Sequence, residues 1–473
     1  MNNLMSATPG GTPPPVTTPA SSGSQATNDA GATERLALIE FIRRRASGSF
    51  FIKVLGAGVG FLVHLATARS VGVAEYGALA LMLSWIGVLS VVAQFGQDNG
   101  VLHYLPTYVV REQWGLIRGL RLGSGFLVLG ASLLLACGGL VYVHWHFGRQ
   151  SLVLIRTFDV GFLMLPLLAL LQQSGALLRA LKHAAESDLY VSIIRPLGLL
   201  FLVALLYALA PALLRAPLVA TCSLLSTVVA IVWSRLRLRR HWPPRARDVR
   251  PEYQMSAWVR VGAQLSVLSV MQVTSINMGS LVIGAFLGAE RVGPYYAAVQ
   301  LASFGSFGLN AINTILAPVI SEHYAAGRLD LLAHLMRRSA RMTFIATTVL
   351  VAGLAIFGRY VLVLFGPGFS AAYVPLLILL VGEWLNTCAG SVGFLLTMTR
   401  FQKQAPGIFL CGAVSSLVLA VLLVPRWSLT GMAVATVAGW TVWNLVALAY
   451  VYRKLHINPT VFQWERAGNA LPR

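Results

Sequence analysis

The sequence predicts an all-α integral membrane protein with about twelve transmembrane helices in two halves of six. Only 11% of its 473 residues are charged and 56% are hydrophobic, with a mean hydropathy of +0.71, whereas soluble domains carry about 25% charged residues. Apolar runs of the length that crosses a hydrocarbon core about 30 Å thick recur along the chain. A polar corner is repeated at half the chain's length, which indicates an internal duplication.

The repeated corner lies between two apolar runs in each half of the chain. Residues 66–81 read ATARSVGVAEYGALAL, and residues 282–301 read VIGAFLGAERVGPYYAAVQL. Both contain a glycine, an Ala-Glu pair, a second glycine and a nearby tyrosine that opens the next run. The two corners are therefore expected to be equivalent turns, one in each lobe.

Apolar runs of suitable length place the spans along the chain. The predicted spans are 50–69, 76–95, 121–143, 157–176, 190–210, 214–234, 261–285, 294–318, 340–359, 372–397, 407–425 and 430–452. The expected divisions are a disordered tail at 1–33, an N-lobe at 34–240, a basic linker at 241–252, a C-lobe at 253–456 and a second tail at 457–473. The first tail is rich in Pro, Gly, Ser and Thr and lacks the apolar residues that would offset the entropy lost on folding.

The distribution of basic residues orients the chain in the membrane. Assigning loops alternately to the two sides puts 29 of the 36 Lys and Arg residues on one side and 7 on the other. Lys and Arg favour cytoplasmic loops, so both termini are predicted to be cytoplasmic and the corner at residues 70–75 to face outward.

The linker region reads RLRLRRHWPPRARDVR at residues 235–250. One interpretation is binding to anionic lipid, worth about 1 kcal/mol for each Lys or Arg near the surface; the other is a linker that only sets topology. Nucleic-acid binding is not expected, because no aromatic residues alternate with the charges. The four cysteines lie singly in apolar segments, so no metal or redox motif is predicted.

The first span carries polar and small residues on one helical face. Lys53, Gly56, Gly60, His64 and Thr67 share this face at about 100° per residue. Lys53 and His64 are candidate substrate-binding residues for an anionic group. The alternative is a packing seam at the glycines, with Lys53 reaching the headgroups and His64 bonded to a neighbouring helix.

The seventh and eighth spans carry further polar stripes. Arg260, Gln264 and Gln272 lie on one side of the seventh span, and Gln300 and Asn310 on one side of the eighth. They are candidate substrate-binding residues that line a water-accessible cavity, although interhelical hydrogen bonds would also explain them.

Glu383 is the most distinctive polar residue, because it lies within an apolar run and shares a face with Asn386. Ionisable groups at membrane depth usually face a cavity or a partner, so the pair is the candidate site for ion or proton coupling. The alternative is a structural acid held by Asn386 or by a basic group. Arg195 is interpreted as a boundary residue near the start of the fifth span.

Enzyme signatures are missing from the sequence. It contains no GxxxxGK[ST] phosphate-binding loop and no HExxH zinc motif. No catalytic residue and no metal ligand are assigned, and the chain is expected to be a transporter or flippase rather than an enzyme.

The corner ATARSVGVAEYG resembles the opening hairpin of Wzx-type polysaccharide flippases. These belong to the multidrug/oligosaccharidyl-lipid/polysaccharide (MOP) exporter superfamily, in which the pattern A-R-x-x-G-x-x-x-Y-G is common. Residues 175–196 (GALLRALKHAAESDLYVSIIRP), 284–301 (GAFLGAERVGPYYAAVQL) and 363–380 (VLFGPGFSAAYVPLLILL) are also similar to that family. The likeness extends from about residue 40 to 456, and it rests on the order and spacing of these stretches.

The resemblance implies a MATE-like arrangement of two six-helix lobes around a central cavity, which opens alternately to the two sides of a bacterial inner membrane. The implied substrate is an undecaprenyl-pyrophosphate-linked oligosaccharide, the repeat unit of an O-antigen, capsule or exopolysaccharide. By position, Lys53, Arg260 and His64 would hold the pyrophosphate. The two corners are expected to meet when the protein faces inward and to separate when it opens outward.

The resemblance implies no cofactor, and H⁺ or Na⁺ are the candidate coupling ions. Implied partners are the lipid-linked substrate, anionic lipids at the linker, a polysaccharide polymerase and glycosyltransferases. Two alternatives stay open at this point: a cation-coupled multidrug exporter of the same superfamily, and a membrane-embedded glycan polymerase or ligase.

Overall fold

The computed structural model describes residues 51–147, 151–455 and 457–462. The tail predicted at 1–33 and residues 463–473 of the second predicted tail lie outside the described residues. The described residues form one compact unit. Within the described residues the secondary structure is helical, with no strand, which confirms the predicted fold class.

The first half of the described chain is a series of long helices joined by short turns. They are the first helix (Phe51–Val71), α2 (Val73–Gln94), α3 (Gln97–Val110), α4 (Trp114–Phe147), α5 (Leu152–Ala180), α6 (Ala184–Leu189), the π-helix η1 (Tyr190–Ile194), α7 (Arg195–Leu209), η2 (Pro211–Leu213) and α8 (Ala216–His241). Helices α6, η1 and α7 follow one another without a break and form a single membrane span, Ala184–Leu209.

The second half follows a short linker that contains the 3₁₀ turn η3 (Pro244–Ala246). Its elements are α9 (Met255–Leu287), α10 (Ala289–Ala302), η4 (Ser303–Ser306), α11 (Phe307–Ala325), α12 (Leu329–Phe365), η5 (Phe369–Ala372), α13 (Tyr373–Ala389), α14 (Val392–Thr397) and α15 (Ala405–Leu455).

Ten helices among the described residues are long and apolar enough to cross a membrane, compared with the twelve spans that the sequence predicts. The difference has two local causes. Helix α15 contains both of the last two predicted spans, and Ser428, with φ 51° and ψ −130°, marks the kink between them. The predicted span 294–318 is divided into α10, η4 and α11, so no single helix covers it.

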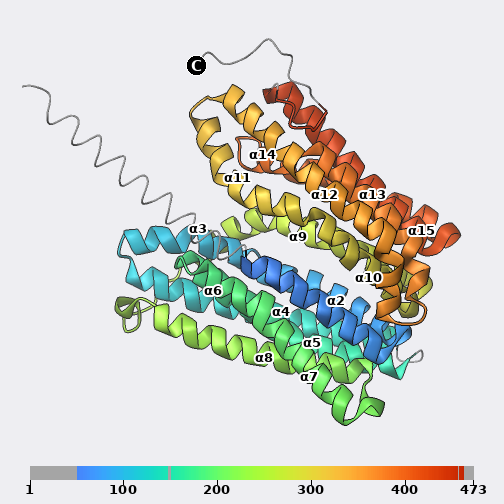
Figure 1. Cartoon of the computed structure of the whole chain (residues 1–473). Coiled ribbons are helices and arrows are strands. Elements are labelled where there is room, and N and C mark those ends of the chain that lie inside the picture. The colour runs from blue at the N-terminus through green and yellow to red at the C-terminus, as the bar shows by residue number, and fades with distance from the viewer. Residues whose placement is uncertain (1–50, 148–150, 456, 463–473) are drawn as a thin grey trace, which may run out of the picture. The chain divides into compact units, whose positions relative to one another are not determined.

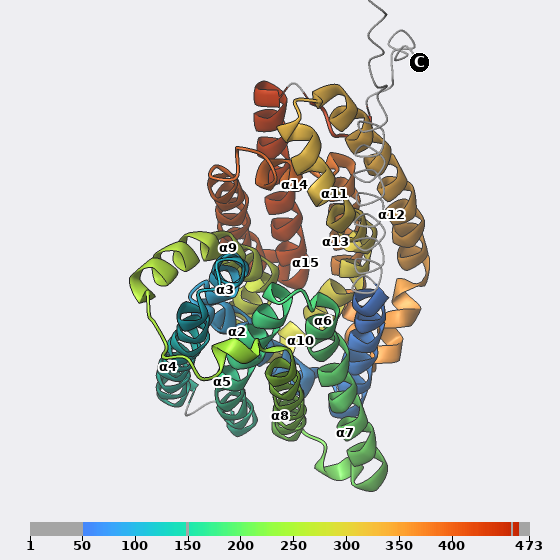
Figure 2. The same ribbon diagram turned by 90° about the vertical axis from the view of Figure 1, so that its left-hand side faces the viewer.

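The helices before and after the linker form two neighbouring groups (Figures 1 and 2). In the first group α5 packs against α2, α4 and α8, and in the second α13 packs against α12 and α15. The groups meet mainly where α2 packs against α10 and α9, and where α3 packs against α9. The division at 241–252 stays a prediction, because residues on both sides of it belong to the same compact unit.

The two corners are structurally equivalent and touch each other. Gly72 (φ 79°, ψ 176°) and Gly288 (φ 84°, ψ 165°) adopt nearly the same positive-φ conformation, which glycine tolerates because it has no Cβ. Five residues further on, Gly77 and Gly293 allow α2 and α10 to approach closely. A Cβ on Gly77 would collide with the carbonyl oxygen of Ala289, and one on Gly293 would lie 2.8 Å from that of Val73.

Candidate functional site

A cavity of about 410 Å³ lies within the first group of helices. Its walls come from the first helix, α2, α5, α7 and α8, with contributions from η1 and from Val273 and Tyr296 of the second group. The polar side chains that line it are His64, Thr67, Tyr76, Ser90, Gln172, Arg195, Ser223 and Tyr296. Among the described lining residues Arg195 is the only Arg or Lys, and there is no Asp or Glu.

Arg195 lies near the middle of its span, 11 residues after Ala184 and 14 before Leu209. The interpretation of Arg195 as a boundary residue is therefore wrong, because the helix begins six residues earlier than the predicted start at residue 190. The π-helix η1 ends immediately before Arg195. A π-helical turn inserts an extra residue and rotates the side chains that follow, and such turns are frequent at functional sites.

Few partners hold the Arg195 side chain. Its Nε donates to Thr227 Oγ1 at 3.1 Å, and the Ser226 hydroxyl donates to its backbone carbonyl at 2.5 Å. No ion pair within the described part of the chain includes Arg195. A charged group at membrane depth is costly unless a cavity or partner compensates for it, and here the cavity offers the space for an anion.

His64 lies in an aromatic cluster beside Arg195. Its Nδ1 is 3.3 Å from the Tyr76 hydroxyl, and its ring contacts that of Tyr296 edge-on with centroids 5.4 Å apart. Tyr296 also hydrogen-bonds to Gln300 and lies close enough to Arg195 to interact with its charge. The cavity therefore presents a cation together with hydroxyl and imidazole groups, which are the donors that bind oxyanions.

The polar face of the first helix contains both a packing position and residues that line the cavity, the two interpretations considered from the sequence. Gly56 is a packing position, because a Cβ there would lie 2.7 Å from Ser192 Cβ. One, two and three turns further on, Gly60, His64 and Thr67 line the cavity. Lys53 lies outside it: this side chain is 53% exposed, and its Nζ is 3.9 Å from Asp188 Oδ2.

The polar residues predicted on the seventh and eighth spans do not converge on this cavity. Arg260, Gln264 and Gln272 are exposed on α9 and are not among the lining residues. Asn310 is exposed on α11, and only Gln300 is linked to the cavity, through Tyr296. A substrate-binding role for these residues stays a prediction.

Glu383 lies in a separate polar cluster in the second group of helices. It is 6% exposed on α13 and is hydrogen-bonded to Asn386, whose Oδ1 accepts from Asn444 Nδ2 at 2.9 Å. Glu383 Oε2 and Asn444 Oδ1 are buried and have no hydrogen-bond partner among the described residues. The 3₁₀ turn η4 between α10 and α11 packs against Glu383, since a Cβ on Gly305 would lie 3.1 Å from Glu383 Cβ.

Sequence reasoning missed Arg195 and Asn444. Asn444 is a lone amide in an apolar run, and only the packing of α15 against α13 brings it to Asn386. Arg195 was interpreted as a boundary residue because the predicted span begins only five residues before it. Moving the start of that helix to Ala184 places it near the middle of the span.

Over residues 43–323, more than half of its length, the chain matches the family described as "Polysaccharide biosynthesis protein". It is 21% identical to "Uncharacterized membrane protein MJ1068" of Methanocaldococcus jannaschii over 422 residues, which cover 82% of this chain and 79% of that protein. It is also 27% identical to "Uncharacterized membrane protein EpsK" of Bacillus subtilis over 176 residues, about a third of each protein.

Solved structures of MOP-superfamily transporters share the fold. An inward-facing multidrug resistance MATE transporter superposes with a TM-score of 0.72 at 15% identity, covering 86% of this chain and 98% of that one. A MOP transporter from Pyrococcus furiosus, described by the "reverse polarity" of its binding pocket, superposes with a TM-score of 0.61 at 15% identity, covering 87% and 95%. An outward-facing MATE transporter superposes with a TM-score of 0.59 at 14% identity, covering 87% of this chain and 95% of that one.

These comparisons confirm the likeness first seen in the corner at residues 66–81. The solved structures that share the fold are transporters, and both sequence relatives are described as membrane proteins. The chain therefore belongs to the polysaccharide biosynthesis protein family and has the fold of the MOP superfamily.

Proposed function

We propose that the protein is a flippase that moves an undecaprenyl-pyrophosphate-linked oligosaccharide across the bacterial inner membrane, with both termini in the cytoplasm. The observation that carries the proposal is the Arg195 guanidinium, held within a cavity whose described lining contains no carboxylate. A guanidinium presents a planar fork of donors that matches the oxygens of a phosphate. The repeat unit would belong to an O-antigen, a capsule or an exopolysaccharide.

The size of the cavity assigns it to one part of that substrate. A volume of about 410 Å³ lies within the usual range of about 300–1,000 Å³ for small-ligand sites. It accommodates a pyrophosphate and the first sugar, whereas the polyprenyl chain and the remaining sugars would extend between the two groups of helices. Tyr76 and Tyr296 offer rings and hydroxyls for contacts with that sugar.

Alternating access follows from the corners. Gly77 and Gly293 bring α2 and α10 together, and Arg69 Nη1 donates to Leu364 O at 3.2 Å at the same end of the helices. If this end is the outer one, as the distribution of basic residues predicts, the structure corresponds to an inward-facing state. The higher TM-score with the inward-facing relative than with the outward-facing one supports that assignment.

Coupling to H⁺ or Na⁺ is proposed at Glu383 and Asn386, with Asn444 as a third member. Glu383 Oε2 and Asn444 Oδ1 have no hydrogen-bond partner among the described residues. Such oxygens can coordinate a hard cation, and the carboxylate can also bind a proton. Thr387 donates to the Glu383 carbonyl at 2.9 Å and fixes the helix beside the acid.

Glu383→Gln should reduce gradient-driven export by about 5- to 150-fold, the range that corresponds to coupling free energies of 1–3 kcal/mol. The amide keeps the shape of the side chain but cannot exchange a proton or neutralise a cation. Export at matched expression is the measurement, and Glu322→Gln, an exposed acid on α11, is the control. Export by Glu383→Gln at the wild-type level would exclude a coupling role.

Anionic lipids are proposed to bind at the basic end of α8 and the linker. The Arg121 guanidinium lies 4.8 Å from the centroid of the Trp242 ring. Arg121 and Arg235 both line a pocket of about 240 Å³ whose other walls include Leu122, Phe126 and Leu129. Arg118, Arg239 and Arg247 add positive charge near Arg121, so a lipid phosphate with acyl chains along the leucines would relieve like-charge repulsion.

The two rival functions predict different features. A cation-coupled multidrug exporter would be expected to place a carboxylate in the drug cavity, whereas the described lining of this cavity has Arg195 and no acid. A glycan polymerase or ligase would need catalytic residues on a large outward loop, and no described connection between helices is long enough to form such a loop. The polymerase and the glycosyltransferases are therefore proposed as separate partner proteins.

Removing the protein from its host tests the proposed function. Polymer at the cell surface should be lost, and undecaprenyl-pyrophosphate-linked repeat units should accumulate with their glycans on the cytoplasmic side. A plasmid that carries the wild-type chain should restore export. Normal polymer at the surface of cells that lack the protein would reject the proposal. So would cells that lack it and accumulate a drug but no lipid-linked glycan.

A further inference from the structure

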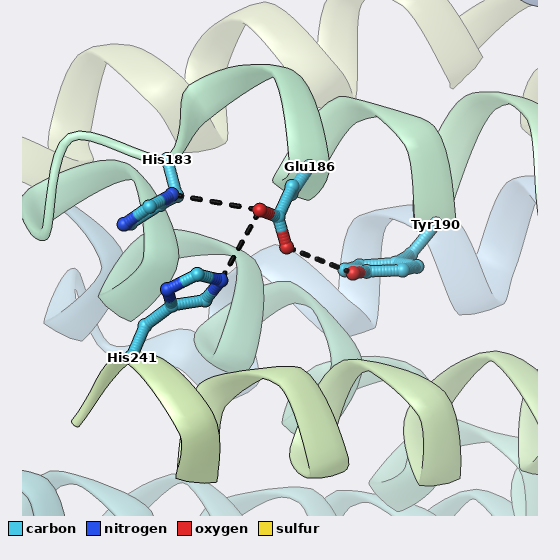
Figure 3. Close-up of polar contacts among 4 residues, drawn as sticks. All are labelled: His183, Glu186, Tyr190 and His241. Atoms are coloured by element: carbon cyan, nitrogen blue, oxygen red, sulfur yellow. Dashed lines mark hydrogen bonds and ion pairs between the residues drawn. The ribbon is translucent and has the colours of Figure 1, made fainter.

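A cluster of two histidines and a glutamate, none of which lines the cavity, lies where α5 turns into α6 and α8 ends. His183 and Glu186 come from the turn and from α6, and His241 is the last residue of α8 (Figure 3). We propose that these three residues form a binding site for a divalent transition-metal ion of the Zn²⁺ type. The family and the proposed flippase activity do not require this site.

The three ligand atoms already have the spacing of a metal site. Glu186 Oε1 lies 3.1 Å from His241 Nε2 and 3.5 Å from His183 Nδ1, and all three atoms lie within 4.8 Å of one another. In a tetrahedral zinc site with bonds of 2.0–2.1 Å, neighbouring ligand atoms are about 3.3 Å apart. The two distances to Glu186 Oε1, 3.1 and 3.5 Å, lie on either side of that value, and the two imidazole nitrogens lie within 4.8 Å of each other, so side-chain rotations that bring the imidazoles together would accommodate an ion.

The surroundings support the ligands. The Tyr190 hydroxyl donates to Glu186 Oε2 at 3.4 Å, which leaves Oε1 directed at the imidazoles, and such outer contacts orient metal ligands. The imidazole rings of His183 and His241 stack with centroids 3.8 Å apart. The side chains are 26–30% exposed, so an ion can enter from solvent and a water molecule can complete the coordination.

The donor set selects the kind of ion. Two imidazoles and one carboxylate suit Zn²⁺, Co²⁺ and Ni²⁺, whereas Mg²⁺ and Ca²⁺ require mainly oxygen ligands. Arg237, Arg239 and Arg240 near the end of α8 add positive charge that opposes weakly held hard cations. Binding therefore depends on the coordinate bonds to nitrogen.

An ion at this place would tie the start of one span to the end of another. Helix α6 carries Asp188, which pairs with Lys53, and it continues through η1 to Arg195 in the cavity. The C-terminal end of α8 leads into the linker between the two groups of helices. Occupancy would therefore fix the cytoplasmic end of the helix whose middle carries Arg195, and this makes the ion a stabiliser of one arrangement of the first group.

The test uses the purified full-length protein in detergent, with the polyhistidine tag removed. Titration with Co²⁺ should give the visible absorption of a nitrogen-ligated ion, and Zn²⁺ should bind with one ion per chain and raise the melting temperature. His241→Ala and Glu186→Gln should lose both effects, whereas His103→Ala, an exposed histidine on α3, should keep them. Tyr190→Phe should weaken Zn²⁺ binding by about 10-fold, and Mg²⁺ should give no signal.

The melting temperature without metal shows whether each variant is folded. Loss of the cobalt spectrum from a His241→Ala protein that melts like the wild type would support the site. An unchanged spectrum and zinc stoichiometry in that variant would overturn the proposal, as would a wild-type protein that binds no Zn²⁺ at micromolar concentrations. Because the readouts are spectroscopic and thermal, their failure would leave the proposed flippase activity unaffected.

Discussion

Arg195→Gln should abolish export of the lipid-linked glycan while leaving the protein folded and in the membrane. The side chain is held by Thr227 alone among the described residues and lines the cavity, so its charge is available to a ligand. Loss of one partner of a buried charge pair costs about 2–5 kcal/mol of binding, or roughly 30-fold to more than 1,000-fold in affinity. The measurement is substrate binding by purified protein together with export in cells.

Three companion variants define the role of Arg195. Arg195→Lys keeps the charge without the planar fork, so an intermediate loss is expected. Lys53→Ala should reduce substrate binding and export less than Arg195→Gln, because that lysine is exposed and pairs with Asp188. Arg359→Gln, a change at an exposed arginine on α12, should bind and export the substrate normally. A substrate affinity for Arg195→Gln equal to that of the wild type would show that the cavity does not hold the phosphate.

A disulfide between cysteines placed at Ala74 and Ala289 should stop transport, and a reducing agent should restore it. The two residues lie in the touching corners, where the Ala289 carbonyl packs against Gly77. Opening this end of the molecule requires α2 and α10 to separate, which a covalent bond prevents. The experiment starts from a chain without Cys137, Cys222, Cys388 and Cys411, and compares oxidised and reduced protein in the same transport assay.

Each single cysteine variant is the control for that experiment, because it forms no bridge within the chain.

Gly77→Val tests the same contact by forcing the two helices apart instead of joining them. Since a Cβ at this position collides with the Ala289 carbonyl, the helices must move apart, and the outward-open state should become more populated. Full transport with the bridge formed would show that the corners are not part of the opening movement.

The sequence was sufficient to predict the helical class, most of the membrane spans and the corners. Apolar runs mark the spans because lipid requires every backbone group to be bonded within the helix, and the glycines at 72 and 288 mark turns that few other residues can adopt. On the first helix, Gly60, His64 and Thr67 line the cavity together, because helical periodicity fixes which residues share a side, whereas Lys53 of the same predicted face lies outside it.

The parts that the sequence did not predict depend on packing between distant segments. Because the helix starts at Ala184, Arg195 lies near the middle of the span and lines the cavity rather than marking a boundary, and a π-helical turn has no simple sequence signal. His241 lies 55 residues after Glu186, and Asn444 lies 58 after Asn386, so neither cluster could be recognised by spacing. Asn310 and Arg260 satisfied the helical pattern, yet their faces are exposed rather than directed into the described cavity.

Flipping by the purified protein in liposomes shows whether the chain itself moves a lipid-linked glycan across a membrane and whether Arg195 is needed for it. Vesicles would contain an undecaprenyl-pyrophosphate-linked oligosaccharide, and a glycosidase added outside would report the fraction of glycan in the outer leaflet. The wild-type chain should expose the inner pool to the enzyme under an imposed H⁺ or Na⁺ gradient, whereas Arg195→Gln should protect it as empty vesicles do. If the inner pool stays protected in wild-type vesicles under both the H⁺ and the Na⁺ gradient, the protein does not flip this substrate and the proposed function is wrong.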